Sequence, residues 1–144
     1  MKKYDIGYTT GAYDLFHVGH LNALRAEKEM CNYLIVGVST DEHILEYKKR
    51  TPVIPFEERI AIVKAIKYVD EVVPQFDSNK MKVWEQHKFN VLFTGSDWKG
   101  TDLCNAYERE FGSIGVEVIY IPYTYGTSST LLTDALRNLS STDH

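Results

Sequence analysis

Two histidines three residues apart, His17 and His20, lie in the segment GAYDLFHVGH, which runs from Gly11 to His20. Residues three apart share one face of a helix, so both imidazoles would point the same way if a helix begins near Gly19. A helix N-terminus offers unpaired backbone N–H groups and a partial positive charge, and imidazole adds further donors. Gly19 would let a phosphate approach the backbone closely. The segment therefore predicts a site that grips phosphate groups.

Two other interpretations of the histidine pair stay open. A metal site would use the same residue type, but the i,i+4 spacing and the glutamate of H-E-x-x-H are missing, and no third ligand is evident in the sequence. The pair could also be two incidental polar residues at a helix start. The composition of the other loops favours the phosphate site.

Three further segments follow predicted strands and are unusual in composition. Lys48, Lys49 and Arg50 form a basic cluster in an acidic chain. A run of three basic residues is more often part of the solvated surface. Here the cluster follows a strand beside the predicted phosphate site, which favours phosphate binding. The segment GSDWKG carries a carboxylate and a tryptophan, and that tryptophan could equally be core packing. The segment GTSST has hydroxyls suited to a helix N-cap, or to phosphate as well.

Apolar runs that alternate with segments of helical period predict the elements that position these loops. The expected strands cover 4–10, 33–39, 70–74, 91–95 and 116–122, and the expected helices cover 19–30, 56–66, 79–87, 103–111 and 129–139. The run YLIVGVS is nearly continuous rather than alternating, which is typical of a strand covered on both faces. We therefore predict an α/β fold: a single Rossmann-like domain over residues 1–139, with a five-stranded parallel sheet, helices on both faces, and a polar tail at 140–144. In such sheets ligands bind beyond the carboxyl ends of the strands.

Composition restricts the class of protein. The chain has 144 residues, about one domain, and a net charge of −4, which gives no reason to expect nucleic-acid binding. Cys31 and Cys104 lack the spacing of a zinc or redox pair and are expected to be free thiols of a reducing compartment. No apolar stretch approaches the length of a membrane helix, and no signal sequence is evident. We expect a cytoplasmic protein without membrane insertion.

Taken together, these motifs carry a resemblance to a known family. The segments GAYDLFHVGH and YLIVGVSTDE look like the opening of the cytidylyltransferases, within the HxGH nucleotidyltransferase superfamily, and KYVDEVVP, GSDWKG and GTSST follow in the family's order. The likeness covers nearly the whole chain and is greatest to bacterial glycerol-3-phosphate cytidylyltransferases. It implies transfer of CMP from CTP to a small phosphorylated alcohol, first of all glycerol 3-phosphate, giving CDP-glycerol and pyrophosphate. It also implies Mg²⁺ as a divalent cofactor and a homodimer to which KYVDEVV contributes.

The resemblance assigns roles residue by residue. His17, His20 and Lys48 would be catalytic. CTP would be bound by Gly11, Ala12, Tyr13, Asp14, Gly19, Gly95, Asp97, Trp98, Thr124, Gly126, Ser128, Ser129 and Thr130. The acceptor and phosphates would be bound by Lys48, Arg50, Arg59, Lys67 and Tyr123, and Asp14 would order the loop or contact the metal. A carboxylate such as Asp97 can accept from the exocyclic amine of cytosine. For Arg59 the alternative is a surface helix residue paired with a glutamate.

The sequence departs from the family pattern at three positions. Arg50 stands where the family has a second lysine, which keeps the charge but changes its geometry. Tyr123 and Lys67 stand where arginine is expected. Tyr123 and Tyr125 could instead face an acceptor with cationic character, such as phosphocholine, because aromatic faces favour quaternary ammonium groups.

Other functions stay open beside the leading one. The acceptor could be phosphocholine or phosphoethanolamine. An adenylyltransferase of the same superfamily would use ATP, although the Asp97 and Trp98 segment favours cytidine. A nucleotide-binding module without catalysis would bind CTP and release no pyrophosphate. The HxGH motif also occurs in class I aminoacyl-tRNA synthetases, but this short acidic chain leaves little room for tRNA recognition.

Overall fold

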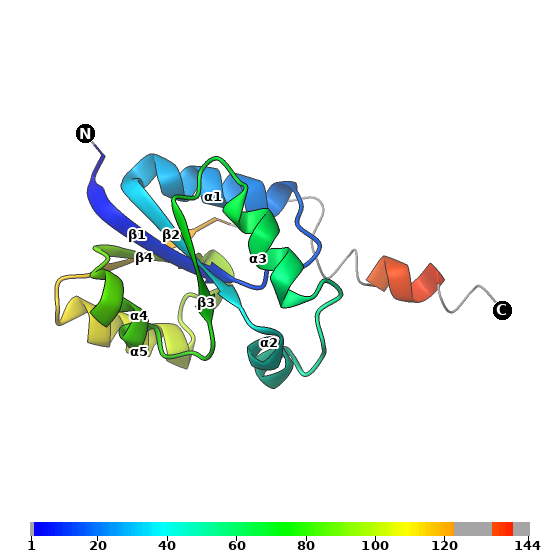
Figure 1. Ribbon diagram of the computed structural model, residues 1–144. Helices are drawn as coiled ribbons and strands as arrows, with labels where there is room; N and C mark the ends of the chain where they lie inside the picture. Colours follow the sequence, from blue (N-terminus) through cyan, green and yellow to red (C-terminus); the bar gives the residue numbers. More distant parts are fainter. Residues whose placement is uncertain (1, 123–133, 140–144) are drawn as a thin grey trace.

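The structure, a computed structural model, describes residues 2–122 and 134–139. The chain alternates strands and helices in the order β1 (Tyr4–Gly11), α1 (Val18–Met30), β2 (Cys31–Ser39), α2 (Asp41–Lys48), α3 (Phe56–Lys64), β3 (Glu71–Gln75), α4 (Lys80–His87), β4 (Val91–Gly95), a 3₁₀ turn η1 (Ser96–Trp98), α5 (Asp102–Gly112) and β5 (Glu117–Ile121) (Figure 1). Residues 134–139 are also helical and form part of the predicted last helix.

The five strands form one parallel sheet in the order β3-β2-β1-β4-β5, which confirms the predicted fold class. The chain moves outward from β1 through β2 to the edge strand β3, and then returns to place β4 on the other side of β1. The loops after β1 and β4 therefore diverge at neighbouring strand ends, which is where open α/β sheets bind ligands. Pro74 lies in β3, an edge strand that tolerates a missing N–H donor.

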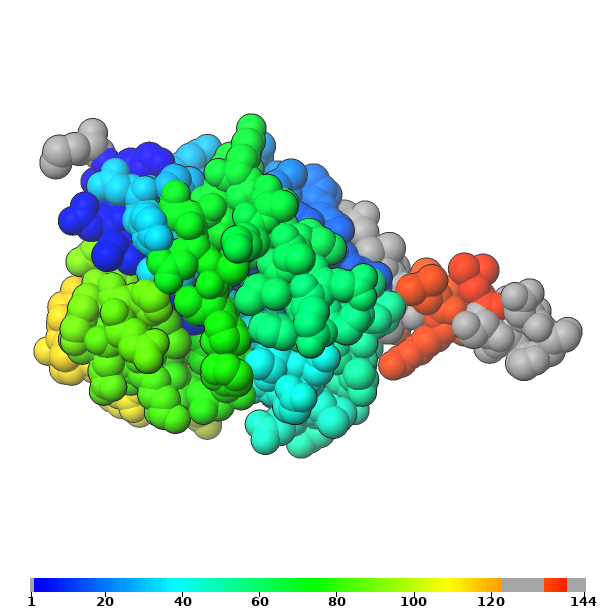
Figure 2. Space-filling model, viewed as in Figure 1, coloured from blue at the N-terminus to red at the C-terminus, as the bar shows by residue number. Residues whose placement is uncertain are grey.

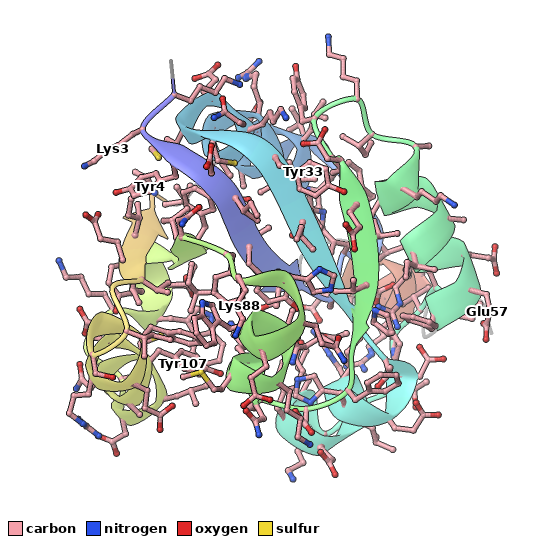
Figure 3. The ribbon with its side chains drawn as sticks, turned by 60° about the vertical axis from the view of Figure 1, so that its left-hand side comes forward. Lys3, Tyr4, Tyr33, Glu57, Lys88 and Tyr107 are labelled. Carbon is pink, nitrogen blue, oxygen red and sulfur yellow. The ribbon has the colours of Figure 1, made fainter. Side chains whose placement is uncertain are left out.

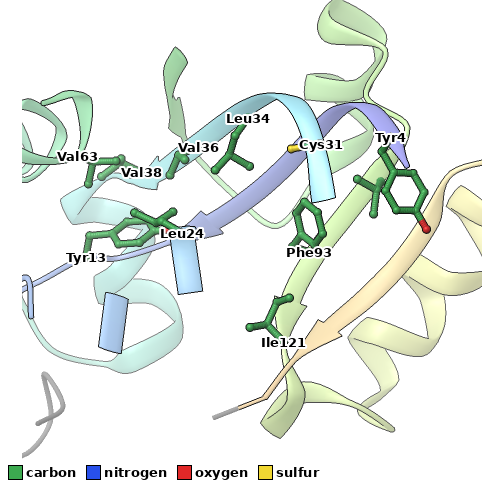
Figure 4. Close-up of a cluster of buried hydrophobic side chains, with 11 residues drawn as sticks. Tyr4, Tyr13, Leu24, Cys31, Leu34, Val36, Val38, Val63, Phe93 and Ile121 are labelled. Carbon is green, nitrogen blue, oxygen red and sulfur yellow. The ribbon is translucent and has the colours of Figure 1, made fainter. Parts of the chain in front are cut away.

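Helices cover both faces of the sheet, as predicted, and each face has its own core. On one face α1 and α3 pack on the central strands through Leu24 and Val63, in a cluster that extends to Phe93 (Figure 4). On the other face α4 and α5 pack through Trp84 and Phe111. Strand β2 is buried from Leu34 to Ser39, which confirms the prediction from its continuous apolar run. In the space-filling view, green side chains of the α3-to-α4 region cover much of one face (Figure 2).

The helix α2 was not predicted, because the sequence after β2 was interpreted as a loop. Thr40 caps this helix by accepting from the His43 N–H, acidic residues occupy its first turn, and Lys49 ends it with φ 59°. Only His43 and Ile44 of the helix are buried, so its apolar pattern is too short to be recognised from periodicity. Lys48 is consequently the last residue of a helix and not part of a loop.

The remaining boundaries agree with the predictions to within two residues, apart from the region near 123–133, which lies outside the described residues. Within the described ranges, no helix is both long enough and apolar enough to cross a membrane.

Candidate functional site

A cavity of about 350 Å³ lies beyond the carboxyl ends of β1, β2, β3 and β4. The sheet rule predicted this edge, and the cavity lining includes residues of the unusual segments that follow β1, β2 and β4. The segment GTSST lies outside the described residues. It is lined by Thr10, Gly11, Ala12, Ser39, His43, Tyr47, Lys48, Gln75, Asp77, Ser78, Lys80, Thr94, Gly95, Asp97, Trp98, Leu103, Cys104 and Tyr107. Gly11, Ala12, Lys48, Gly95, Asp97 and Trp98 are residues that the sequence had singled out.

The paired histidines form the N-terminal cap of α1. The Nδ1 atom of His17 accepts from the Gly19 N–H at 3.0 Å, and the Nδ1 atom of His20 accepts from the His17 N–H at 3.2 Å. Their ring centroids are 4.0 Å apart, so both imidazoles lie together as predicted. Because each Nδ1 is an acceptor, each neutral ring carries its proton on Nε2. The two rings thus have Nε2–H donors that the cap does not use.

Burial keeps both histidines neutral. Desolvation lowers the pKa of His17, and it lowers the pKa of His20 to about 4, with the neighbouring His17 and Lys48 acting in the same direction. The charge of Lys48 therefore acts on His20. At neutral pH the imidazoles act as hydrogen-bond donors, while the positive charge comes from lysine.

The loop between β1 and α1 has a strained backbone, and hydrogen bonds from the segment before α3 hold it in place. Tyr13 and Leu15 have φ of 53° and 51°, a left-handed conformation that non-glycine residues rarely adopt. The Asp14 carboxylate accepts from the N–H groups of Val53 and Ile54, each at 2.8 Å. Asp14 was predicted either to order the loop or to contact a metal, and these two hydrogen bonds show the first role.

The structure places Arg59 differently from both expectations. Its side chain has no exposed surface and therefore presents no open face to a ligand, and it pairs with Asp41 at 2.7 Å, not with a glutamate. Its other contacts are backbone carbonyl groups, those of Ile54, Ala12 and Ser39. Arg59 thus ties the loop after β1 to the end of β2 and to the segment before α3.

Of the basic cluster, Lys48 lines the cavity from the end of α2, as expected, whereas Lys49 and Arg50 are not among the lining residues. Desolvation and the charge of Arg50 lower the pKa of Lys48, and Asp14 acts in the opposite direction. The Lys48 ammonium lies 5.8 Å from the centre of the Tyr47 ring. Lys48 therefore connects the cavity to the histidine loop.

The segment after β4 lies at the other side of the cavity. Asp97 and Trp98 both line the cavity, and Trp98 is 42% exposed, so the alternative of core packing is wrong. Gly95 permits this geometry, because a Cβ there would lie 2.6 Å from the Asp97 carboxylate.

Not all predicted site residues line the cavity. Those absent from its lining include Tyr13, Asp14, His17, Gly19, His20, Arg50 and Arg59. Lys67 precedes β3 and lies at the amino end of that strand, on the opposite edge of the sheet from the histidines. The predicted residues Tyr123, Thr124, Gly126, Ser128, Ser129 and Thr130 lie outside the described residues.

Several cavity residues were not found from the sequence. His43 and Tyr47 belong to the unpredicted helix α2, and Gln75, Lys80 and Tyr107 come from the end of β3, α4 and α5. The strand-end rule could have indicated Gln75. Lys80 and Tyr107 carry no sequence signal, because helical position alone does not show which side chains reach a cavity.

Within residues 2–122 and 134–139 there is no cluster of three His, Cys, Asp or Glu side chains that could hold a metal ion. A site built wholly from these protein ligands is thus not present in that part of the chain. An ion held mainly by phosphate oxygens needs only one or two carboxylates from the protein.

Comparisons with known proteins agree with this arrangement. A profile of the cytidylyltransferase-like family matches residues 8–143. The chain is 35% identical over 138 residues to the glycerol-3-phosphate cytidylyltransferase of Bacillus subtilis, covering 91% of this chain and 96% of that protein. It is 56% identical over 88 residues to the ethanolamine-phosphate cytidylyltransferase of Mus musculus, covering 60% of this chain and 22% of that protein.

A solved structure shows the same fold. The lipopolysaccharide core biosynthesis protein from Thermoplasma volcanium superposes with a TM-score of 0.70 at 21% identity, covering 86% of this chain and 99% of that one. The profile match spans nearly the whole chain, and the Bacillus relative matches over almost its full length. The chain therefore belongs to the cytidylyltransferase-like family.

Proposed function

We propose that this protein transfers CMP from CTP to a small phosphorylated alcohol, with glycerol 3-phosphate as the first candidate. The observation that carries the proposal is the paired Nε2–H donors of His17 and His20 at the N-terminus of α1, beside a cavity lined by Lys48. Family membership supports nucleotidyl transfer. The likeness to the Bacillus glycerol-3-phosphate enzyme over most of both chains supports the acceptor.

The reaction requires the two substrates to be positioned and their negative charge to be neutralised, and it does not require a general base. A phosphate oxygen of the acceptor forms a bond to the α-phosphorus of CTP, and the bond from that phosphorus to the bridging oxygen of the β-phosphate breaks, releasing pyrophosphate. The acceptor phosphate is largely ionised at neutral pH, so no proton has to be removed. The barrier comes from bringing two anions together and from charge on the phosphoryl oxygens.

The site residues divide this work. His17 and His20 would donate from Nε2 to the triphosphate, and their neutral state leaves these donors unchanged across the neutral pH range. Lys48 would neutralise the approaching phosphate, and Arg50 would add a second cation near it. Asp97 and Trp98 would hold the cytosine, through the carboxylate and the exposed ring. Thr124 and the segment from Gly126 to Thr130 would complete the nucleotide site.

Mg²⁺ is the divalent cation that we expect to accompany CTP, and the residues fit an ion carried by the nucleotide. Triphosphate oxygens would supply most of its ligands, and Asp14 is the carboxylate of the histidine loop that could contact it, although both Asp14 oxygens already accept backbone N–H groups. When bound, the ion would neutralise charge on the triphosphate.

Pyrophosphate release tests the proposal. The protein is incubated with CTP or ATP and with glycerol 3-phosphate, phosphocholine or phosphoethanolamine, and pyrophosphate is measured. We expect release with CTP and glycerol 3-phosphate, and much less with ATP. Turnover with ATP alone would reject the cytidine assignment, and CTP binding without turnover on any acceptor would show a binding module.

We also propose a cytoplasmic homodimer built around the KYVDEVV segment, from Lys67 to Val73, which leads into and forms most of the edge strand β3. An edge strand has unpaired backbone groups that a second chain can satisfy. The buried free thiols Cys31 and Cys104 suit a reducing compartment. Lys67 would then belong to the interface and not to the cavity of its own chain.

A further inference from the structure

Glu27 of α1 is a buried acid that the proposed mechanism does not use. The residue is 4% exposed, whereas charged side chains such as Lys3 and Glu57 extend outward from the fold (Figure 3). Its Oε1 atom accepts from the Thr9 hydroxyl of β1 at 3.3 Å. Within the described ranges its Oε2 atom has no hydrogen-bond partner, and its carboxyl group forms no ion pair. A leucine would fill the same space without desolvating a carboxyl group, so packing alone does not explain Glu27.

Glu27 shares one face of α1 with His20 and Leu24. The three residues are spaced i, i+4 and i+7, so their side chains follow one another along the face that packs on the sheet. Leu24 has no exposed surface and belongs to the same buried cluster as Tyr13, beside which it lies in Figure 4. The face of α1 that carries a histidine of the site therefore also carries the buried acid.

Thr9 and Tyr13 connect Glu27 to the loop between β1 and α1. Burial raises the pKa of the Tyr13 hydroxyl, and the nearby Glu27 carboxyl group acts in the same direction, while a hydrogen bond with the Thr9 hydroxyl acts in the opposite direction. The Thr9 hydroxyl thus contacts both Glu27 and Tyr13. Since Thr9 gives its proton to Glu27, its oxygen is left to accept from Tyr13.

The Tyr13 ring supports the His20 imidazole. The two ring centroids are 5.4 Å apart with the rings edge-on, and the Phe16 ring centroid lies 5.2 Å from that of the same imidazole. Tyr13 holds this place with a left-handed backbone, φ 53°, so contacts at its side chain must offset the strain. A shift of the Tyr13 hydroxyl would turn the ring against His20 and change the direction of its Nε2–H donor.

We propose that Glu27 is a positioning residue for nucleotidyl transfer, which through Thr9 and Tyr13 sets the direction in which His20 donates. The inference rests on the proposed function, because that function assigns the His20 donor to the triphosphate. Glu27 is not among the residues that line the cavity, so its effect on the reaction passes through Thr9 and Tyr13. A group misplaced by about 1 Å can cost a large part of the rate.

The network of Glu27, Thr9 and Tyr13 has one group that changes charge near neutral pH. Burial raises the pKa of Glu27 to about 8, with the Thr9 hydrogen bond acting in the opposite direction, so the carboxyl group is mostly protonated at pH 7. The other titratable groups beside it are Tyr13 and Cys31, whose thiol donates to the Glu27 backbone carbonyl, and burial raises the pKa of both. The sheet contributes apolar side chains to this side, such as Ile121. Above about pH 8 a buried charge without a cation would therefore disturb the network.

The test compares kcat, the KM for each substrate and their pH dependence in the wild type and in variants. With CTP and glycerol 3-phosphate, Glu27→Leu should lower kcat at pH 7 about tenfold, because a misaligned donor is lost mainly in the transition state. The KM for glycerol 3-phosphate should stay the same. Leucine removes a desolvated carboxyl group, so the unfolding midpoint should stay the same or rise, and the loss of kcat cannot then come from unfolding.

Glu27→Gln keeps an oxygen that accepts from Thr9 and cannot ionise. It should recover most of the kcat that Glu27→Leu loses at pH 7. In the wild type we expect kcat to fall as pH rises through about 8, as Glu27 loses its proton, and this decline should be absent in Glu27→Gln. Glu29→Gln is the matched control, at an exposed position of the same helix, and should follow the wild type at every pH.

Thr9→Val tests the connection itself, because valine has the shape of threonine and lacks the hydroxyl. It should lower kcat about as much as Glu27→Leu does. The double variant should lose no more than either single variant, since both break the same path. A readout that needs no turnover is the nitrogen NMR signal of the His20 imidazole without nucleotide. That signal should shift as pH passes about 8 in the wild type and not in Glu27→Gln.

Three results would overturn the role of Glu27. They are a Glu27→Leu variant with the kcat of the wild type, a Glu27→Gln variant that keeps the alkaline decline, and losses from Glu27→Leu and Thr9→Val that add in the double variant. Each of these leaves nucleotidyl transfer in place. A wild type that releases no pyrophosphate with any acceptor would instead reject the proposed function. In that case a pH-dependent shift of the His20 signal would still show the connection to Glu27, and its absence would reject the connection as well.

Discussion

At the residue scale, the histidine pair combines two roles in one arrangement of atoms. The Nδ1 atoms of His17 and His20 cap α1, and their Nε2–H groups are left for a ligand. Alanine at either position would remove the cap and the donor together, so its effect on activity could not be assigned. A residue that keeps the cap without the second donor separates the two roles.

His17→Asn is that variant, since asparagine is among the best N-cap residues and lacks a donor at the position of Nε2. We expect the free energy of unfolding to change by less than about 0.5 kcal/mol. We expect kcat for pyrophosphate release to fall roughly 10²- to 10³-fold, the loss typical of removing one donor to a developing anion. His17→Ala should lose about 1 kcal/mol of stability as well. Unchanged turnover in the folded His17→Asn protein would contradict the donor role.

Burial also changes the protonation of Glu27 on α1. Its Oε1 accepts from the Thr9 hydroxyl at 3.3 Å, and its Oε2 is buried without a partner among the described residues. Desolvation raises the pKa of Glu27 to about 8. The folded state therefore binds a proton that the unfolded state has lost, and stability contributed by this group falls as pH rises from about 4.5 to about 8.

We expect Glu27→Gln to be more stable than the wild type at neutral and alkaline pH. The difference in free energy of unfolding should be small near pH 4, grow to roughly 1–3 kcal/mol at pH 7, and level off above about pH 8. Urea unfolding at pH 5, 7 and 9 measures this. Glu29→Gln, at an exposed position of the same helix, is the control and should show no such trend. A difference that does not vary with pH would contradict the buried, protonated state of Glu27.

At the scale of elements, one arginine holds three chain segments at the ligand edge of the sheet. Arg59 lies on α3, and its guanidinium donates to the carbonyl groups of Ala12, Ser39 and Ile54. It also donates to the Asp41 carboxylate on α2. It thereby fixes the loop after β1, the end of β2 and the segment before α3. The strained backbone at Tyr13 and Leu15 needs such external support.

Arg59→Met should destabilise the protein by about 2–4 kcal/mol, because three buried or partly buried carbonyl groups and the Asp41 carboxylate lose their donor. The exposed Arg25→Met on α1 should change stability by no more than about 0.5 kcal/mol. Chemical denaturation measures both, and the KM for CTP should rise in Arg59→Met as the histidine loop relaxes. A loss of turnover with full stability and unchanged loop order would instead indicate direct contact of Arg59 with substrate.

At the scale of the whole molecule, the ligand edge collects residues from both halves of the sheet. The strand order places β1 at the centre, so the loop with His17 and His20 lies beside the loop with Asp97 and Trp98, although the two are about eighty residues apart in the sequence. A nucleotide that contacts both loops links the two halves of the sheet. Binding should therefore stabilise the fold as a unit.

We expect CTP to raise the thermal unfolding midpoint by roughly 5–10 °C at about 100 times its dissociation constant. ATP at the same concentration should raise it less. Differential scanning fluorimetry with and without Mg²⁺ measures both, and the ion is expected to increase the effect of CTP. An equal shift from both nucleotides would argue against base recognition at Asp97 and Trp98.

The amino-acid sequence by itself determined the strands, the helices other than α2, the parallel sheet with both faces covered, and the edge of the sheet at which the segments after β1, β2 and β4 meet. These follow from local chemistry: apolar period, the continuous run in β2, and the strand-end rule that holds for open parallel sheets. It also determined the family, because the motifs occur in a fixed order along the chain.

Only the tertiary structure decided which side chains share a site. It placed Arg59 inside the protein, set Lys67 at the far edge of the sheet, and brought Lys80 and Tyr107 into the cavity beside Lys48. The physical reason is that burial, pKa and pairing depend on neighbours from distant parts of the chain. A lysine on a short helix has the same sequence signal whether it faces water or an enclosed cavity.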